Sequence, residues 1–313
     1  MTRPIRCMLV LLCILFLLGT GCSQSDSKPT KEASAPLPAS FEPSTQAPAV
    51  KIDVPLPPTP APTPEPTPVP TATPTPTPTP TPVPTPTPEL ITNDMLDSGM
   101  FDALFDDVVF VGDSITWTFS HYVRNVRQKE PAFLGDAKFL ATVSMSVRVA
   151  CRDRVTSGGV NFNYRGRDTS VTDGINRSEA KRAFVLLGLN DLAIQDWELV
   201  RTNFGKLIDA IHEKCPGVQV IITGVFPVTD KFCDKAGQEW NSFNIGLEQV
   251  CKDHDADFFS FAEKLMAPDG QLNLAYCGDG KCHLNIPGEE IWVRELRKYI
   301  LQQTRTDILF EDS

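Results

Sequence analysis

The fold of this chain is decided by the stretch Val108-Val109-Phe110-Val111-Gly112-Asp113-Ser114. Its unbroken apolar run indicates a strand that is buried on both faces, as in a parallel α/β sheet. Ligands of such sheets bind beyond the carboxyl ends of the strands. Residues 115–123 are expected to be helical, which places Ser114 at a helix N-terminus, where backbone N–H groups and the helix dipole favour negative charge. The stretch therefore predicts a serine at the ligand-binding edge of a sheet.

Strand and helix patterns alternate through residues 94–313, which are enough chain for one domain with its own core. Strands are predicted at Val108–Val111, Lys138–Val143, Arg182–Leu187, Val218–Thr223 and Asp257–Phe261, and helices at Ile115–Lys129, Trp197–Lys214, Gln238–Lys252 and Pro287–Gln303. This alternation predicts an α/β domain, a three-layer α/β/α sandwich around a mostly parallel five-stranded sheet of the flavodoxin-like kind. Residues 152–176 are less regular and indicate a hairpin or a loop excursion.

Two further polar segments follow apolar strands or precede the last helix. Gly188-Leu189-Asn190-Asp191 comes after the apolar run 184–187, and Gly280-Lys281-Cys282-His283-Leu284-Asn285 comes before the C-terminal helix. Serine, glycine, asparagine and histidine in this order resemble the four sequence blocks of the SGNH (GDSL-type) hydrolases. The resemblance covers residues 106–302, and its first and third blocks are intact as Gly112-Asp113-Ser114 and Gly188-Leu189-Asn190-Asp191.

The resemblance implies a serine hydrolase site. A serine hydroxyl needs an adjacent base, which histidine supplies, and a carboxylate on the other ring nitrogen fixes the tautomer. These roles map to Ser114 as nucleophile, His283 as base and Asp279 as acid. The resemblance further assigns an oxyanion hole to the backbone N–H of Ser114, to Gly188, to the amide of Asn190 and to the second block, here Ser144-Met145-Ser146.

Two departures from the family pattern affect this assignment. The second block carries Ser144 where the family has glycine, but a backbone N–H donor needs glycine only where φ is positive. The family's acid stands three residues before the histidine, whereas Asp279 stands four before His283. A serine–histidine dyad, oriented by a backbone carbonyl or a water molecule, is therefore the alternative to a triad.

Structural roles are the alternative for several of these residues. Asn190 could cap the segment that follows it. Trp117 could line a substrate cleft, although aromatic residues near helices usually belong to the core. Among the histidines, His212 and His254 lie near the ends of amphipathic helices, and His121 falls within the helix after Ser114. His283 alone stands in a loop rich in glycine and aspartate, which favours it as the base.

The N-terminal part of the chain indicates export. Arg3 and Arg6 precede an apolar run at residues 8–18, and Gly19-Thr20-Gly21-Cys22 follows. This pattern predicts a signal peptide at residues 1–21, too short to span a bilayer. Its end resembles a bacterial lipobox, which implies that Cys22 becomes the lipidated first residue and anchors the protein outside the cytoplasm, on the bacterial membrane. Ordinary secretion or a retained anchor are the alternatives.

Residues 22–93 lack apolar periodicity and predict a tether. Threonine and proline alternate through residues 57–88, and proline fixes φ while donating no backbone hydrogen bond. Such a segment is expected to form extended polyproline II structure and to reach about 100 Å at about 3.1 Å per residue. The domain boundaries predicted by the sequence are thus 1–21, 22–93 and 94–313.

The cysteines of the domain permit disulfides. After Cys7, Cys13 and Cys22 are set aside, six remain: Cys151, Cys215, Cys233, Cys251, Cys277 and Cys282. An even number in an exported domain allows bridges but leaves their pairing open. Cys277 and Cys282 are close enough in sequence for a local bridge, and Cys215 could meet Cys251 at the lower sheet edge. No spacing has a zinc pattern, so we expect no metal.

Charge and motifs narrow the class of function. A formal net charge of −10 disfavours nucleic acid as a partner, and the absence of a glycine-rich dinucleotide or phosphate-binding motif disfavours a cofactor. The first hypothesis is a surface-anchored serine esterase that acts on a small acyl ester, such as an O-acetyl group on a cell-wall or other glycan. The second is a catalytically inactive domain of the same family that binds wall polymer or a protein. A general lipase is disfavoured because no long apolar lid is evident. The sequence leaves the oligomeric state open.

Overall fold

The computed structural model describes residues 88–192, 196–232 and 234–311. The predicted signal peptide, Cys22 and nearly all of the predicted tether lie outside the described residues, as does Cys233. No helix among the described residues is long and apolar enough to cross a membrane.

The central sheet of the described residues consists of five strands: β2 (Val108–Gly112), β3 (Lys138–Ala141), β6 (Arg182–Leu186), β7 (Gln219–Thr223) and β8 (Asp257–Phe259). Their order is β3-β2-β6-β7-β8, and every neighbouring pair is parallel. This is the flavodoxin-like order of a doubly wound sheet. All five residues of β2 are buried, as its apolar sequence requires. The predicted fold class is confirmed.

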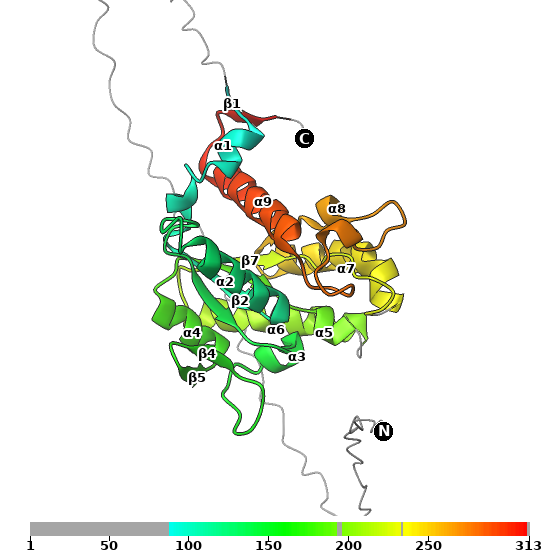
Figure 1. Cartoon of the computed structure of the whole chain (residues 1–313). Helices are drawn as coiled ribbons and strands as arrows, with labels where there is room; N and C mark the ends of the chain where they lie inside the picture. Colours follow the sequence, from blue (N-terminus) through cyan, green and yellow to red (C-terminus); the bar gives the residue numbers. More distant parts are fainter. Residues whose placement is uncertain (1–87, 193–195, 233, 312–313) are drawn as a thin grey trace, which may run out of the picture. The chain divides into compact units, whose positions relative to one another are not determined.

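Among the described residues, five helices of eight or more residues cover the two faces of the sheet (Figure 1): α2 (Ser114–Val126), α4 (Val171–Ser178), α6 (Trp197–Lys214), α7 (Asp234–Asp253) and α9 (Ile286–Thr304). Crossovers between parallel strands are right-handed. Because the chain reverses its direction across the sheet after β3, the helical crossovers directly before and after β3 lie on opposite faces. Phe119 of α2 stacks on Trp292 of α9, with ring centroids 4.1 Å apart. On the other face, Phe204 of α6 contacts Phe243 of α7.

Aromatic packing holds β2 at the centre of the core. Phe110 contacts Phe119 of α2, Phe139 of β3 and Phe184 of β6, with ring centroids 5.3–5.5 Å apart. Aromatic side chains bury large apolar areas and favour such offset or edge-to-face contacts. The strand that leads to Ser114 is therefore fixed on three sides.

Capping side chains set where the helices that flank the site begin. The Asp113 carboxylate accepts a hydrogen bond from Ile115 N, and the Asn285 side chain accepts one from Gly288 N. Both are preferred N-cap residues, and Pro287 stands in the first turn of α9 as predicted. The predicted helix at 287–303 is confirmed to within one residue at each end, whereas α7 begins four residues before its predicted start.

The irregular region 152–176 contains a hairpin, one of the two predicted alternatives. Its strands, β4 (Phe162–Tyr164) and β5 (Arg167–Thr169), are antiparallel. The sequence analysis missed α4, although Ser170 caps it by accepting a hydrogen bond from Asp173 N. Other short elements it missed are α3 (Val147–Ala150), α5 (Leu189–Leu192), α8 (Ala262–Leu265), η1 (Asp102–Phe105) and η2 (Leu274–Tyr276).

The two ends of the described chain pair with each other. Strand β1 (Glu89–Ile91) runs parallel to β9 (Ile308–Phe310), and helix α1 (Asn93–Asp97) follows β1. A small hydrophobic cluster of Ile91, Leu96 and Leu301 packs beneath them. Strand β1 thus lies within the segment predicted as tether, because the C-terminal strand gives residues 89–91 a partner that is distant in sequence.

Candidate active site

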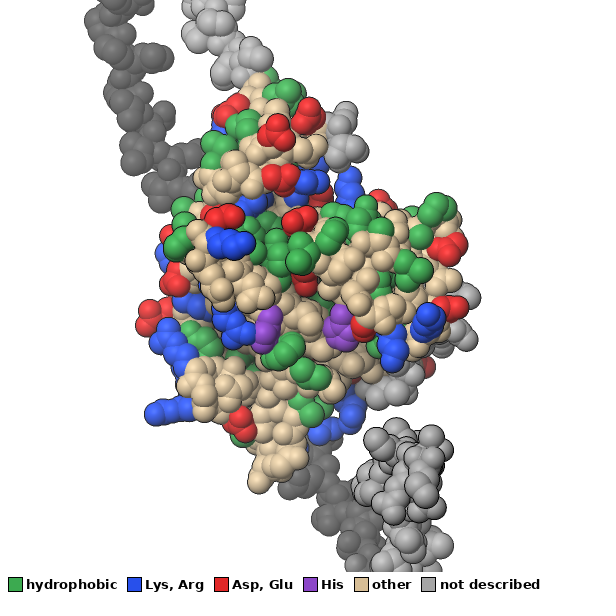
Figure 2. Space-filling model, viewed as in Figure 1, with side chains coloured by type: hydrophobic (Ala, Val, Ile, Leu, Met, Phe, Trp, Pro, Cys, Tyr) green, Lys and Arg blue, Asp and Glu red, His purple; other side chains and the backbone are tan. Residues whose placement is uncertain are grey.

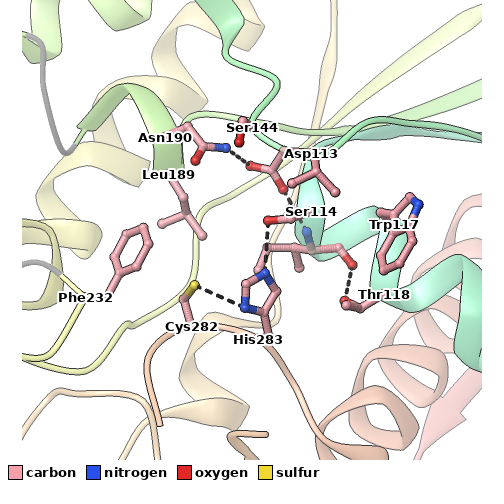
Figure 3. Close-up of a pocket in the computed structure, with 12 residues that line it drawn as sticks. Asp113, Ser114, Trp117, Thr118, Ser144, Leu189, Asn190, Phe232, Cys282 and His283 are labelled. Atoms are coloured by element: carbon pink, nitrogen blue, oxygen red, sulfur yellow. Dashed lines mark hydrogen bonds between the residues drawn. The ribbon is translucent and has the colours of Figure 1, made fainter. Parts of the chain in front are cut away.

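The site lies where the direction of chain winding reverses, between β2 and β6. Because the connections after these two adjacent strands lead to opposite faces, they leave a crevice at the carboxyl edge of the sheet. A pocket of about 440 Å³ occupies this position (Figure 3). Its polar lining includes Ser114, Ser144, Asn190 and His283. The structure therefore brings together residues from all four sequence blocks.

Ser114, His283 and Asp279 form a continuous hydrogen-bonded chain. Ser114 is the first residue of α2, and its Oγ lies 3.0 Å from His283 Nε2. On the opposite side of the ring, Nδ1 lies 2.6 Å from Asp279 Oδ2. A carboxylate at Nδ1 favours the tautomer that leaves Nε2 free to accept the serine proton. This is the geometry that a triad requires.

The loop 279–283 wraps around the Asp279 carboxylate. Oδ1 accepts hydrogen bonds from the backbone N–H groups of Lys281, Cys282 and His283 at 2.8, 3.0 and 3.2 Å. Gly280 has φ of 71°, a left-handed conformation that accommodates the additional residue between acid and base. Partial burial favours the neutral acid, but the hydrogen bonds from the imidazole and these N–H groups outweigh it and hold the pKa of Asp279 well below its usual range.

Two residues that line the pocket, Ser114 and Ser144, carry backbone N–H groups that are candidate oxyanion donors. In the described chain, neither Ser114 N–H, at the start of α2, nor Ser144 N–H has an intramolecular acceptor. Ser144 has φ of 62°, so it adopts the left-handed conformation that favours glycine. Because φ is positive at this position, the replacement of the family's glycine by serine affects the backbone here. The surrounding structure holds the Ser144 backbone in this conformation.

The Asn190 amide does not have a free hydrogen for an oxyanion. Its Nδ2 donates to Asp113 Oδ2 and to the Met145 carbonyl oxygen, both at 3.0 Å. The predicted donor role of its side chain is therefore not seen in this geometry, because two nearer acceptors use both N–H bonds. Burial raises the pKa of Asp113 to about 7, although its hydrogen bond from Ile115 N opposes this. The Asn190 side chain thus links Asp113 of the first block to Met145 of the second block, and we call this pair of hydrogen bonds the Asn190 clamp.

Asp191, the last residue of the third block, binds the backbone that directly follows the second block. Asp191 is fully buried, and its carboxylate accepts hydrogen bonds from Val147 N at 2.7 Å and Arg148 N at 3.1 Å, at the start of α3. The role of Asp191 could not be predicted from the sequence, because its two hydrogen-bond donors lie 43 and 44 residues away in the chain. Gly188, predicted in the oxyanion hole, does not line the pocket. Its φ of 110° instead turns the chain between β6 and Asn190.

Comparison with known proteins agrees with this arrangement. Residues 110–291, more than half of the chain, match the model of the GDSL-like lipase/acylhydrolase family. The chain belongs to this family. No curated protein matches it.

Solved structures similar to this GDSL-like acylhydrolase are distant in sequence. A putative acylhydrolase from Bacteroides fragilis has 16% identity and a TM-score of 0.48, with 63% of this chain and 88% of that chain covered. A catalytic mutant of an acetylxylan esterase from Geobacillus stearothermophilus has 15% identity and a TM-score of 0.44, with 62% and 93% covered.

Apolar side chains form the open side of the hydrolase pocket. Trp117 and Val143 are 42% and 50% exposed at its mouth, and Leu189 and Phe232 complete the wall. A pocket of this size lies in the lower part of the range for small-molecule sites, roughly 300–1,000 Å³. The other histidines, His121, His212 and His254, do not line it.

The cysteines near the site are thiols. The five described cysteines are free, so neither a Cys277–Cys282 nor a Cys215–Cys251 bridge is formed. The Cys282 side chain is buried with Sγ 3.7 Å from His283 Nδ1, while Cys277 Sγ lies 3.6 Å from Asp279 Oδ1. Burial raises the pKa of Cys282 to about 12, which keeps this thiol neutral and a poor nucleophile.

The contacts of Asp279 predict the effect of Asp279→Asn. The amide oxygen retains the loop hydrogen bonds, but the amide nitrogen favours the wrong imidazole tautomer. We expect kcat to fall by about three to four powers of ten, measured with a small ester, while the circular dichroism spectrum is retained. A kcat within a few fold of the native value, together with an inactive His283→Ala variant, would instead support a dyad.

The conformation of Ser144 predicts opposite effects for two substitutions. Ser144→Gly keeps the backbone N–H and removes strain, so we expect full activity and a free energy of unfolding equal to the native value or up to about 1 kcal/mol higher. Ser144→Val places a β-branched residue at positive φ and is expected to lose about 1–3 kcal/mol and most activity. Urea titration of both variants measures this, with Ser120→Gly in α2 as the control, expected to lose about 0.5–1 kcal/mol. Equal stability of the glycine and valine variants would contradict the assignment.

Proposed function

We propose that this GDSL-like hydrolase is a serine esterase that removes short acyl groups, such as acetyl, from a cell-wall or other extracellular glycan. The observation that carries the proposal is the hydrogen-bonded chain from Ser114 through His283 to Asp279, with Oγ–Nε2 and Nδ1–Oδ2 distances of 3.0 and 2.6 Å. It ends in a pocket lined by Ser114 and Ser144, whose backbone N–H groups have no acceptor among the described residues.

The reaction proceeds through an acyl-enzyme. Ser114 Oγ attacks the ester carbonyl carbon while its proton passes to His283 Nε2, and the carbonyl oxygen gains negative charge. The N–H groups of Ser114 and Ser144 stabilise that charge, and one such donor contributes about 2.7–4 kcal/mol of barrier lowering in hydrolases of this type. His283 then protonates the departing alcohol. Water, activated by the same imidazole, attacks the acyl-Ser114 ester and releases the carboxylic acid, restoring the serine.

The depressed pKa of Asp279 supports this mechanism over a wide pH range. The carboxylate stays ionised throughout neutral and mildly acidic solution, so it stabilises the imidazolium that forms in each half-reaction. The corresponding contribution to folding stability is complete above the unfolded pKa of about 3.9 and is lost as the pH falls through the lower folded value.

The shape of the pocket supports a short acyl group on a large alcohol. The pocket has a volume of about 440 Å³ and opens past Trp117 and Val143 to solvent. The acyl group fits inside, and the alcohol remains at the open mouth, where its size is not limited. The location we propose is the outer face of the bacterial membrane, through a lipid on Cys22 and the predicted tether at residues 22–93, whose threonine and proline alternate through residues 57–88.

Loss of the serine hydroxyl tests the proposed chemistry. We expect the full-length chain to hydrolyse p-nitrophenyl acetate and Ser114→Ala to reduce the rate to the uncatalysed level, because the nucleophile is removed. Release of p-nitrophenolate measures this. Unchanged turnover in Ser114→Ala would remove the nucleophile assignment, and an inactive native chain would favour the wall-binding alternative.

Loss of Cys22 tests the proposed location. Cys22→Ser is expected to release the protein from the membrane fraction or to block its processing, since the thiol that carries the lipid is gone. Cell fractionation, with intact-mass measurement of the mature chain, records both results. A mature chain that begins at another residue would show ordinary secretion instead.

A further inference from the structure

A second, larger cavity adjoins the active-site pocket. It is a groove of about 920 Å³ between α2 and α9, near the end of α1. Thr118 lines both the groove and the pocket, and Leu284 and Asn285, which directly follow His283, form part of the groove wall. Figure 2 shows this face, where hydrophobic side chains gather over α2 and α9 among acidic and basic ones. The groove therefore extends from the reactive serine over the surface.

A buried carboxyl group lies in this groove. Glu289 is 3% exposed, and within the described part of the chain its Oε2 has no hydrogen-bond partner. Burial raises the pKa of Glu289 well above its usual range, which favours the neutral form of the carboxyl group. A neutral carboxyl both donates and accepts hydrogen bonds. A buried polar group without a partner costs free energy, so a ligand hydroxyl that pairs with it would remove this cost.

Basic and acidic side chains both line the groove, and both of its arginines have carboxylate partners. Arg294 Nη2 lies 2.6 Å from Asp97 Oδ2, and Arg297 Nε donates to Asp102 Oδ1 at 2.8 Å. The charged lining comprises Asp97, Lys129, Glu130, Glu290, Arg294 and Arg297, with three residues of each sign. Such a lining offers no net attraction to an anion or a cation. It also disfavours a long acyl chain, which would bury these groups without giving them partners.

Aromatic surface completes the groove. Tyr122 and Phe133 line it and contact each other edge to face, with centroids 6.0 Å apart. Sugar rings present apolar C–H faces and hydroxyl edges, so they match aromatic surface beside neutral hydrogen-bonding groups. Asn125, exposed on α2, adds an amide at the rim.

We propose that the groove between α2 and α9 binds uncharged sugar residues next to the acylated one, with Glu289 paired to a ring hydroxyl. This inference rests on the proposed esterase function and names its substrate as an oligosaccharide chain rather than a small free ester. The volume of the groove, near the upper end of the range for ligand sites, accommodates more than one ring.

Two variants test the groove without changing the catalytic residues. Asn125→Trp fills it from an exposed position, and Glu289→Leu removes the buried hydrogen-bonding group. Arg124→Trp is the matched control, because Arg124 is exposed on the same helix and does not line the groove. The substrates are p-nitrophenyl acetate and chemically O-acetylated tetrasaccharides of N-acetylglucosamine and of xylose.

We expect kcat/KM for an acetylated tetrasaccharide to fall at least tenfold relative to kcat/KM for p-nitrophenyl acetate in both groove variants, and this ratio to stay native in Arg124→Trp. The melting temperature of Glu289→Leu is expected to equal or exceed the native value, since an unpartnered buried carboxyl is removed. An unchanged ratio in both groove variants would overturn the proposal.

Binding separates failure of the groove from failure of the esterase. Full-length Ser114→Ala is titrated with the same tetrasaccharides by calorimetry, with and without Asn125→Trp. Binding that Asn125→Trp weakens at least tenfold supports the groove even if the native chain hydrolyses no ester. Absence of measurable binding and of tetrasaccharide hydrolysis, or binding that Asn125→Trp leaves unchanged, refutes it.

Discussion

The Asn190 amide is the interaction on which the arrangement of the site depends. Its two N–H bonds reach Asp113, which caps the helix that begins with Ser114, and the carbonyl of Met145, beside Ser144. One planar group therefore sets the distance between the serine and the second block. Because the strands end at one sheet edge but their loops diverge, no regular element provides this link.

The clamp explains how a site can be built largely from backbone groups. Asp191 binds the start of α3, Asn190 binds the loop before it, and this loop carries Ser144, which lines the pocket. On the other side, the 279–283 loop closes around the Asp279 carboxylate through three N–H groups. The reactive groups are thus positioned by side chains that take no part in bond making, and the donors need no reorganisation when charge develops.

The sequence predicted the sheet and the site's main residues because both depend on local patterns. Each local pattern can be recognised without the others: the apolar run before Ser114, the polar residues after β6 and the loop before α9. The parallel topology of the sheet then brings these segments together at one edge. It did not predict the direction of the Asn190 amide, the positive φ of Ser144 or the pairing of residues 89–91 with the C-terminal strand. Each of these is decided by neighbours that are distant in the chain.

The oxyanion site proposed for this hydrolase consists of the backbone N–H groups of Ser114 and Ser144, held in place by the hydrogen bonds of Asn190. A crystal structure of the protein after reaction with a p-nitrophenyl phosphonate ester tests this most directly. We expect phosphorus on Ser114 Oγ, with one phosphoryl oxygen about 2.7–3.1 Å from both Ser114 N and Ser144 N. Asn190 should still bind Asp113 and Met145. Phosphorus on another residue, or a phosphoryl oxygen held by Asn190 Nδ2 with the Met145 bond broken, would contradict it.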